Sequence, residues 1–196
     1  VDWACSSALE RLGFATAREV AAYWNAVTGE EARAWLALAL RAGRVEEALV
    51  EGADGARRRV FAVPGLAGAA VPEVAGRLRV LSPFDPALRD RDRAEFLFGF
   101  RYRIEVFVPE PKRVFGYYSL PLLHNGDLIG RFDLKSNRQE HTLQVRSSWA
   151  EEKRASKFPA VAVAKHFAQI AKWQGLKTIE VANRGNVALE LGADRL

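Results

Sequence analysis

The chain has 196 residues, of which 49% are hydrophobic and 27% are charged, a balance that favours a globular protein over a disordered one. Its length suits one large domain or two small ones. No apolar run approaches the roughly 20 residues that cross a bilayer, and no signal peptide opens the sequence. The single cysteine, Cys5, excludes an internal disulfide framework and fits the reducing cytoplasm.

The charge balance points to a polyanionic partner. Basic residues number 29 and acidic residues 24, which gives a net charge of +5 and a pI near 9.6. Of the basic residues, 22 are Arg and 7 are Lys. A GC-rich genome explains most of that ratio, but it does not explain the net positive charge, which fits a nucleic acid.

Three helices are predicted in the first 42 residues. The first runs from 2 to 12, with Asp2 as its cap. The second and third begin at capping-box patterns, Thr-x-x-Glu, at Thr16 and Thr28. Apolar residues recur at helical spacing through the third helix, and Gly43 ends it.

A β-hairpin is predicted next. Two strand-like runs, 45–50 and 57–63, flank a turn at 52–55. Three helices followed by a hairpin of these lengths predict a winged-helix domain over residues 1–64. A linker rich in Gly, Ala and Pro follows over residues 65–76.

Residues 77–196 are expected to form a β-rich domain, an antiparallel β-meander with packed helices, so the fold class is α+β. Asn125 and Gly126 stand between two strand-like runs and predict a tight hairpin turn, because both residues tolerate positive φ. The expected strands, in chain order, are 101–108, 117–123, 128–135, 142–148 and 178–182.

Three helices accompany these strands. A short one is expected over residues 88–98. A long one follows Pro159 and ends near Trp173, and its apolar stripe should pack on the sheet. A final short helix covers residues 187–191.

Three adjacent arginines are candidate DNA contacts. Arg57, Arg58 and Arg59 open the second strand of the predicted wing, where guanidinium groups can neutralise phosphates. A solvated strand end is the alternative. Because side chains alternate along a strand, one of the three should point away from the other two.

The third predicted helix offers a second basic group. Arg33, Arg41 and Arg44 lie on it or just after it, where a helix-turn-helix protein places its recognition helix. For Arg33 the alternative is an ion pair with Glu30 or Glu31.

A third group lies in the second domain, where Lys112 and Arg113 precede Tyr117 and Tyr118. Basic and aromatic side chains together can grip a backbone and stack an unpaired base. We expect DNA contact from the basic pair and core positions for the two tyrosines.

Metal and cofactor sites are not expected. Asp85 and Asp90 lie near Arg89, Arg91 and Arg93, so structural ion pairs are predicted there, and no histidine sits nearby. The three histidines of the chain are scattered, without the spacing of zinc ligands.

One run of sequence carries a family resemblance. It includes Leu-Ser-Pro-Phe-Asp-Pro at 81–86, Asp90-Arg91, the segments 100–113 and 116–123, and Gly-Arg-Phe-Asp-Leu-Lys at 130–135. This run closely resembles the C-terminal β-domain of the bacterial winged-helix DNA glycosylases, the YcaQ/AlkZ crosslink-repair family. The resemblance extends over residues 76 to about 196 and, less closely, over residues 1–64.

The resemblance implies the C-terminal, DNA-binding half of a DNA glycosylase that hydrolyses the N-glycosidic bond of alkylated or interstrand-crosslinked purines in duplex DNA. It implies a monomer without cofactor or metal, in the bacterial cytoplasm and associated with the nucleoid. Asp85 and Arg91, which lie in the matching motif, would then border the DNA cleft.

The catalytic motif of that family, Gln-x-Gln or Gln-x-Asp, is expected upstream of this chain. Gln139, Gln144, Gln169 and Gln174 do not have that spacing, so no catalytic residue is expected here. The absence of methionine also favours a fragment. Two alternatives remain open: a non-catalytic winged-helix transcriptional regulator, and a glycosylase remnant without activity.

Overall fold

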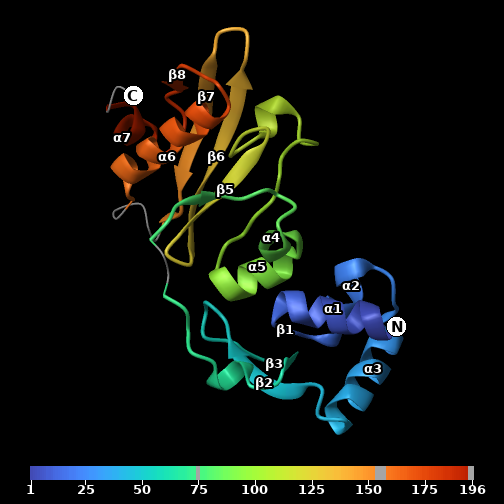
Figure 1. Cartoon of the computed structure of the whole chain (residues 1–196). Coiled ribbons are helices and arrows are strands. Elements are labelled where there is room, and N and C mark those ends of the chain that lie inside the picture. Colours follow the sequence, from blue (N-terminus) through green and yellow to red (C-terminus); the bar gives the residue numbers. More distant parts are fainter. Residues whose placement is uncertain (74–75, 153–157, 194–196) are drawn as a thin grey trace. The chain divides into compact units, whose positions relative to one another are not determined.

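The computed structural model of the chain describes residues 1–73, 76–152 and 158–193 (Figure 1). The chain forms two compact units. The first contains Val1–Glu73 and Asp90–Arg101, and the second contains the described residues of Val74–Arg89 and Tyr102–Leu196. Both units combine helices with antiparallel strands, which confirms the mixed α+β class.

Three helices open the first unit, namely α1 (Asp2–Leu12), α2 (Ala17–Trp24) and α3 (Gly29–Arg41). Both predicted capping boxes are present: the Thr16 and Thr28 hydroxyls each accept a hydrogen bond from the backbone N–H three residues on. The expectation for Asp2 is wrong, because α1 has no side-chain cap. The Asp2 carboxylate instead serves a tertiary contact described below.

A three-stranded antiparallel sheet completes this unit. Its strands are β1 (Phe14–Ala15), β2 (Glu46–Glu51) and β3 (Arg57–Ala62), in the order β1-β3-β2. The β2–β3 pairing confirms the predicted hairpin. A single-turn helix, η1 (Leu66–Gly68), follows β3.

The predicted helix over residues 88–98 is divided in two, α4 (Pro86–Arg89) and α5 (Arg91–Phe98). The break falls at Asp90, whose carboxylate accepts a hydrogen bond from the Arg93 N–H (3.1 Å) and so begins a new helix. α5 packs within the first unit, where the Phe96 carbonyl accepts a hydrogen bond from the N–H of Ala53, in the β2–β3 turn (2.8 Å). The boundaries 1–64, 65–76 and 77–196 stay a prediction.

The second unit contains a five-stranded sheet in the order β4-β5-β6-β7-β8. Asn125 (φ 52°) and Gly126 (φ 82°) form the tight turn between β5 and β6, as predicted. β8 is parallel to β7 and the other pairs are antiparallel. The strands are β4 (Arg79–Val80), β5 (Ser119–His124), β6 (Asp127–Asn137), β7 (Thr142–Ala150) and β8 (Thr178–Val181).

The parallel pair follows from α6 (Ala160–Trp173), which connects β7 to β8 and packs on the sheet (Figure 1). Phe167 of α6 meets Phe132 of β6 edge to face, with ring centroids 5.2 Å apart, and both side chains are fully buried. Val163 and Phe167 lie in this core and Ile170 packs against it, as predicted. A short helix, α7 (Ala188–Ala193), ends the described chain.

One predicted strand is wrong. Residues 101–108 have no strand, and a single-turn helix, η2 (Glu110–Lys112), follows them. The alternation breaks because Glu105 is buried (8% exposed) while Phe107 is 95% exposed. The Glu105 carboxylate binds backbone N–H groups of its own loop, which replaces strand pairing.

Candidate nucleic-acid interface

The three hairpin arginines are all exposed but have different surroundings. Arg57 donates to the Glu51 carboxylate across the strand pair (3.0 Å). The Arg58 guanidinium lies over the Phe96 ring of α5, 3.8 Å from its centroid. Arg59 has no ion-pair partner among the residues that the structure describes. The prediction that one of the three points away from the others is confirmed, with Arg58 as that residue.

The hairpin face that carries Arg57 and Arg59 has mixed charge. In the β2–β3 register Arg57 lies opposite Glu51 and Arg59 opposite Leu49, and Glu47 is exposed on the same face. Two carboxylates therefore offset two guanidinium groups. Phosphate contact by the three hairpin arginines stays a prediction. It depends most on Arg58 and Arg59, because Arg57 already pairs with Glu51.

Arg44, just after the end of α3, makes a structural contact. Its guanidinium donates to the Asp2 carboxylate (2.9 Å) and lies 5.2 Å from the centroid of the Trp35 ring. The Trp35 indole N–H donates to the same carboxylate (2.5 Å), and these two donors hold the pKa of Asp2 below its ordinary value. Arg44 thus helps to fasten α1 to α3.

The other basic residues of α3, Arg33 and Arg41, have no ion-pair partner in the described residues. Arg41 is exposed in the last turn, with no ion-pair partner in the described parts of the chain. Neither Glu30 nor Glu31 forms an ion pair with Arg33 there. The Glu31 carboxylate accepts from the Thr28 N–H (2.8 Å) and completes the capping box instead.

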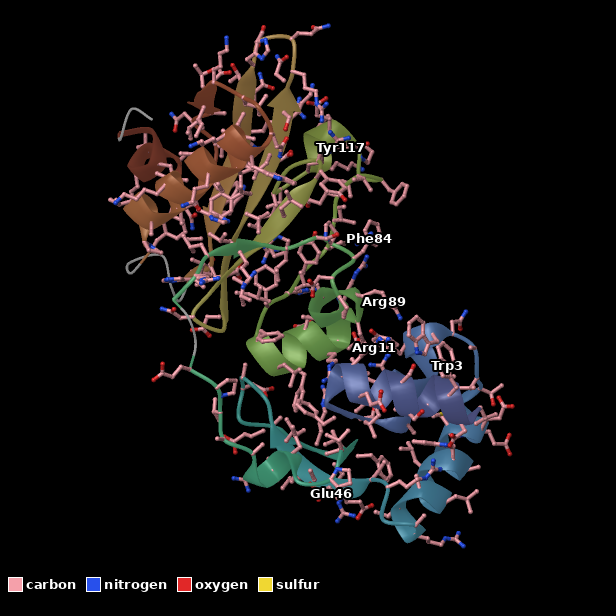
Figure 2. The ribbon with its side chains drawn as sticks, viewed as in Figure 1. Trp3, Arg11, Glu46, Phe84, Arg89 and Tyr117 are labelled. Carbon is pink, nitrogen blue, oxygen red and sulfur yellow. The ribbon has the colours of Figure 1, made fainter. Side chains whose placement is uncertain are left out.

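Arg113 lies beside an exposed tyrosine, Tyr117, which is labelled in Figure 2. The Arg113 guanidinium lies 4.8 Å from the centroid of the Tyr117 ring, and its Nε donates to the Val108 carbonyl (2.8 Å). Tyr117 is 45% exposed, so the expectation that it belongs to the core is wrong. Tyr118 is half-buried and Lys112 is exposed.

The acidic residues near α4 and α5 act as helix caps. The Asp85 carboxylate accepts from the Ala87 N–H at the start of α4 (2.9 Å). Asp90 caps α5 and pairs with Arg18 of α2 (3.2 Å), 72 residues away, rather than with a neighbour in sequence. Arg91 is exposed. The placement of Asp85 and Arg91 at the border of a DNA cleft stays a prediction.

A buried polar cluster lies in the second unit, and sequence reasoning did not find it. Glu105 accepts hydrogen bonds from the N–H groups of Val114, Phe115 and Gly116, at 3.2, 2.8 and 3.2 Å. On β6, Asp133 accepts from the Tyr117 N–H (2.7 Å). The donors are backbone groups, so no motif of side chains marks the cluster. The only signal is an acidic residue among the alternating apolar residues at 102–108.

A comparison with known families identifies the chain. The family described as DNA glycosylase AlkZ-like matches residues 1–173. The chain belongs to the AlkZ-like DNA glycosylase family. Membership gives DNA as the partner and places the chain among the glycosylases of DNA repair, which are hydrolases. No solved structure matches the chain.

The AlkZ-like chain shows no metal site in the described residues, since no three His, Cys, Asp or Glu side chains come together there. Burial lowers the pKa of His166 on α6 and raises the pKa of the Cys5 thiol. No helix of the described chain is both long and apolar enough to cross a membrane.

Proposed function

We propose that this AlkZ-like chain binds and positions duplex DNA for hydrolysis of the N-glycosidic bond of an alkylated or interstrand-crosslinked purine. The family match over residues 1–173 carries the proposal. The net charge of +5 supports it, because a polyanion attracts a basic protein. The chain lacks the Gln-x-Gln or Gln-x-Asp spacing, so its own share of the reaction is DNA binding.

The chemistry of the lesion fits a separation of DNA binding, by this chain, from catalysis by the Gln motif. A positively charged alkylated purine is already a good leaving group, so the enzyme mainly places a water and stabilises the oxocarbenium character of the sugar. Two amide or carboxylate side chains suffice for that step. Many glycosylases rotate the target base out of the helix, which a crosslink to the opposite strand hinders.

We further propose that residues 1–64 form a winged helix, that 65–76 link it to a β-rich domain at 77–196, and that the protein acts as a monomer on the bacterial nucleoid. Three helices and a three-stranded antiparallel sheet are compatible with the first part. The β2–β3 hairpin would then be the wing, lying against the phosphate backbone.

The candidate cations divide into those without and those with a carboxylate or carbonyl partner in the described residues. Arg58, Arg59, Arg41 and Lys112 are proposed phosphate contacts, and none has an ion-pair partner within the described residues. Arg57, Arg44 and Arg113 are proposed to act more weakly, because Glu51, Asp2 and the Val108 carbonyl respectively engage them.

The salt dependence of duplex binding tests this assignment. Each phosphate contact contributes about 0.9 to the slope of log K against log salt concentration. Replacing Arg57, Arg58 and Arg59 together with Ala should weaken binding and flatten this slope by about two, since Glu51 already neutralises Arg57. Arg138→Ala, an exposed arginine near the end of β6, controls for the general loss of charge.

An unchanged slope in the triple variant would remove the hairpin from the interface. Strong preference for one duplex sequence would instead favour the transcriptional regulator, because a glycosylase needs preference for a lesion and little for sequence.

A further inference from the structure

The loop of residues 105–116 is closed by one buried carboxylate. Glu105 is 8% exposed, and its two oxygens accept three backbone N–H groups from residues 114–116 at the far end of the loop. A carboxylate with several backbone donors forms strong, charge-assisted hydrogen bonds. The two ends of the loop are thereby joined.

Further hydrogen bonds fix the backbone on either side of this closure. The Val108 N–H donates to the Glu105 carbonyl (3.0 Å), and Arg113 Nε donates to the Val108 carbonyl (2.8 Å). Arg184 donates to the Arg113 carbonyl (2.9 Å). A loop tied at this many points holds its shape before any ligand arrives, so binding costs little ordering entropy.

This fixed loop exposes aromatic rings. Phe107 is 95% exposed and Tyr117, directly after the loop, is 45% exposed. The Arg113 guanidinium lies over the Tyr117 ring, and its Nε donates to the carbonyl of Val108, the residue after Phe107. In Figure 2 the labels Tyr117, Phe84 and Arg89 follow one another along one edge of the second unit, and Phe84 is also 71% exposed.

The exposed charges on this loop and at Arg184, which contacts it, are mostly positive. Arg103, Lys112 and Arg184 are exposed and Arg113 is half-buried, while Glu110 is the one exposed carboxylate between residues 103 and 117. Exposed rings among cations match what single-stranded or unstacked nucleic acid requires: a π-face for a base and positive charge for its phosphate. A purely apolar protein partner would leave these cations without counter-charges.

We propose that Phe107 and Tyr117 form a stacking site for an unpaired base of duplex DNA, with Lys112 and Arg113 binding the adjacent phosphates. The inference rests on the proposed DNA-binding function and adds the feature of DNA that is recognised. Glu105 is a positioning residue, since it holds the loop and does not touch the base. Such a site favours DNA at places where pairing has been lost, as beside a lesion or a base that has left the stack.

Two duplexes of equal length test the site. One is fully paired, and the other carries a single unpaired 2-aminopurine, whose fluorescence falls when an aromatic ring stacks on it. The chain should bind the second duplex roughly tenfold more tightly and quench its fluorescence. Phe107→Ala and Tyr117→Leu should each reduce this preference severalfold and weaken the quenching, with a much smaller effect on the affinity for the paired duplex.

Two further variants sharpen the result. Trp173→Ala removes an aromatic ring that is 83% exposed at the end of α6 and should change neither affinity. Glu105→Gln loses the carboxylate that closes the loop and should reduce the preference without lowering the affinity for the paired duplex.

The outcomes separate this inference from the proposed function. Binding to both duplexes with equal affinity, or a preference that survives both ring variants, overturns the stacking site and leaves the DNA-binding role in place. Failure to bind either duplex overturns both. A loss of preference in Trp173→Ala equal to that in Phe107→Ala also overturns the site, because the effect would then be unspecific.

Discussion

The roles of several side chains in this protein are determined by partners far away in the sequence. The sequence predicts Asp2 as a helix cap, yet Asp2 is the first residue of α1 and its carboxylate accepts from the Trp35 indole and from Arg44. Trp35 is only 7% exposed, and a buried indole N–H needs an acceptor. The tertiary partner therefore decides the role of the aspartate, which a local pattern cannot reveal.

Asp2 should make stability sensitive to acid. The Trp35 hydrogen bond, then Arg44, lowers the pKa of Asp2 in the folded state below its ordinary 3.8. The ionised form therefore stabilises the fold above that value, and this contribution is lost as the pH falls through the lower, folded pKa. We expect Asp2→Asn to reduce the urea midpoint near neutral pH and to show a weaker decline of the midpoint between about pH 5 and pH 3. If the urea midpoints of the wild-type protein and Asp2→Asn declined equally as the pH falls, this role of Asp2 would be contradicted.

At the scale of elements, two capping boxes of the same pattern differ in their surroundings. Glu31 of α3 is exposed, whereas Glu19 of α2 is 6% exposed and pairs with the buried Arg93 of α5 (3.3 Å). Arg93 also donates to the Leu12 carbonyl, at the end of α1 (3.2 Å). Arg93 thus joins α5 to α2 by an ion pair and to α1 by a hydrogen bond.

Removing Glu19 should therefore cost much more than removing Glu31. Glu19→Ala leaves Arg93 buried without its counter-charge, a loss of about 3 kcal/mol in the free energy of unfolding. Glu31→Ala loses a cap alone and should cost clearly less. Urea unfolding followed by tryptophan fluorescence measures both variants, and similar losses in the two would show that the Glu19–Arg93 pair contributes little.

In the second unit, the position of Gly185, after β8, has room only for glycine. Its φ is +117°, and a Cβ there would overlap the Ser148 carbonyl oxygen of β7. Gly185→Ala should destabilise this sheet by more than about 2 kcal/mol. Gly192→Ala in α7, where a Cβ meets nothing within 4 Å, should be neutral or stabilising. Amide hydrogen exchange in β7 and β8 distinguishes them, and unchanged protection in Gly185→Ala would contradict the close approach.

The elements that sequence predicted correctly are those that local chemistry determines. The Thr16 and Thr28 capping boxes and the Asn125-Gly126 turn each need only a few neighbouring residues. The strand predicted at residues 101–108 failed because Glu105 binds N–H groups about ten residues away. For the same reason the candidate cations were found from sequence, while their partners, such as Glu51 for Arg57 and Asp2 for Arg44, were not.

At the scale of the whole molecule, family and charge agree. An AlkZ-like glycosylase acts on DNA, and a net charge of +5 favours association with it. The proposed contacts include Arg41, Arg58 and Arg59 in the first unit and Lys112 in the second. Binding to undamaged duplex should accordingly weaken steeply with salt.

Base release from duplexes that contain N7-methylguanine or an interstrand crosslink tests the central claim most directly. Base release and duplex binding by this chain of 196 residues are measured on the same damaged duplexes. We predict that the chain binds these duplexes without releasing the damaged base. Release of the base by the chain would contradict its assignment as a DNA-positioning protein without a catalytic motif. Tight binding to one specific sequence, without preference for the damaged duplexes, would contradict the glycosylase assignment itself.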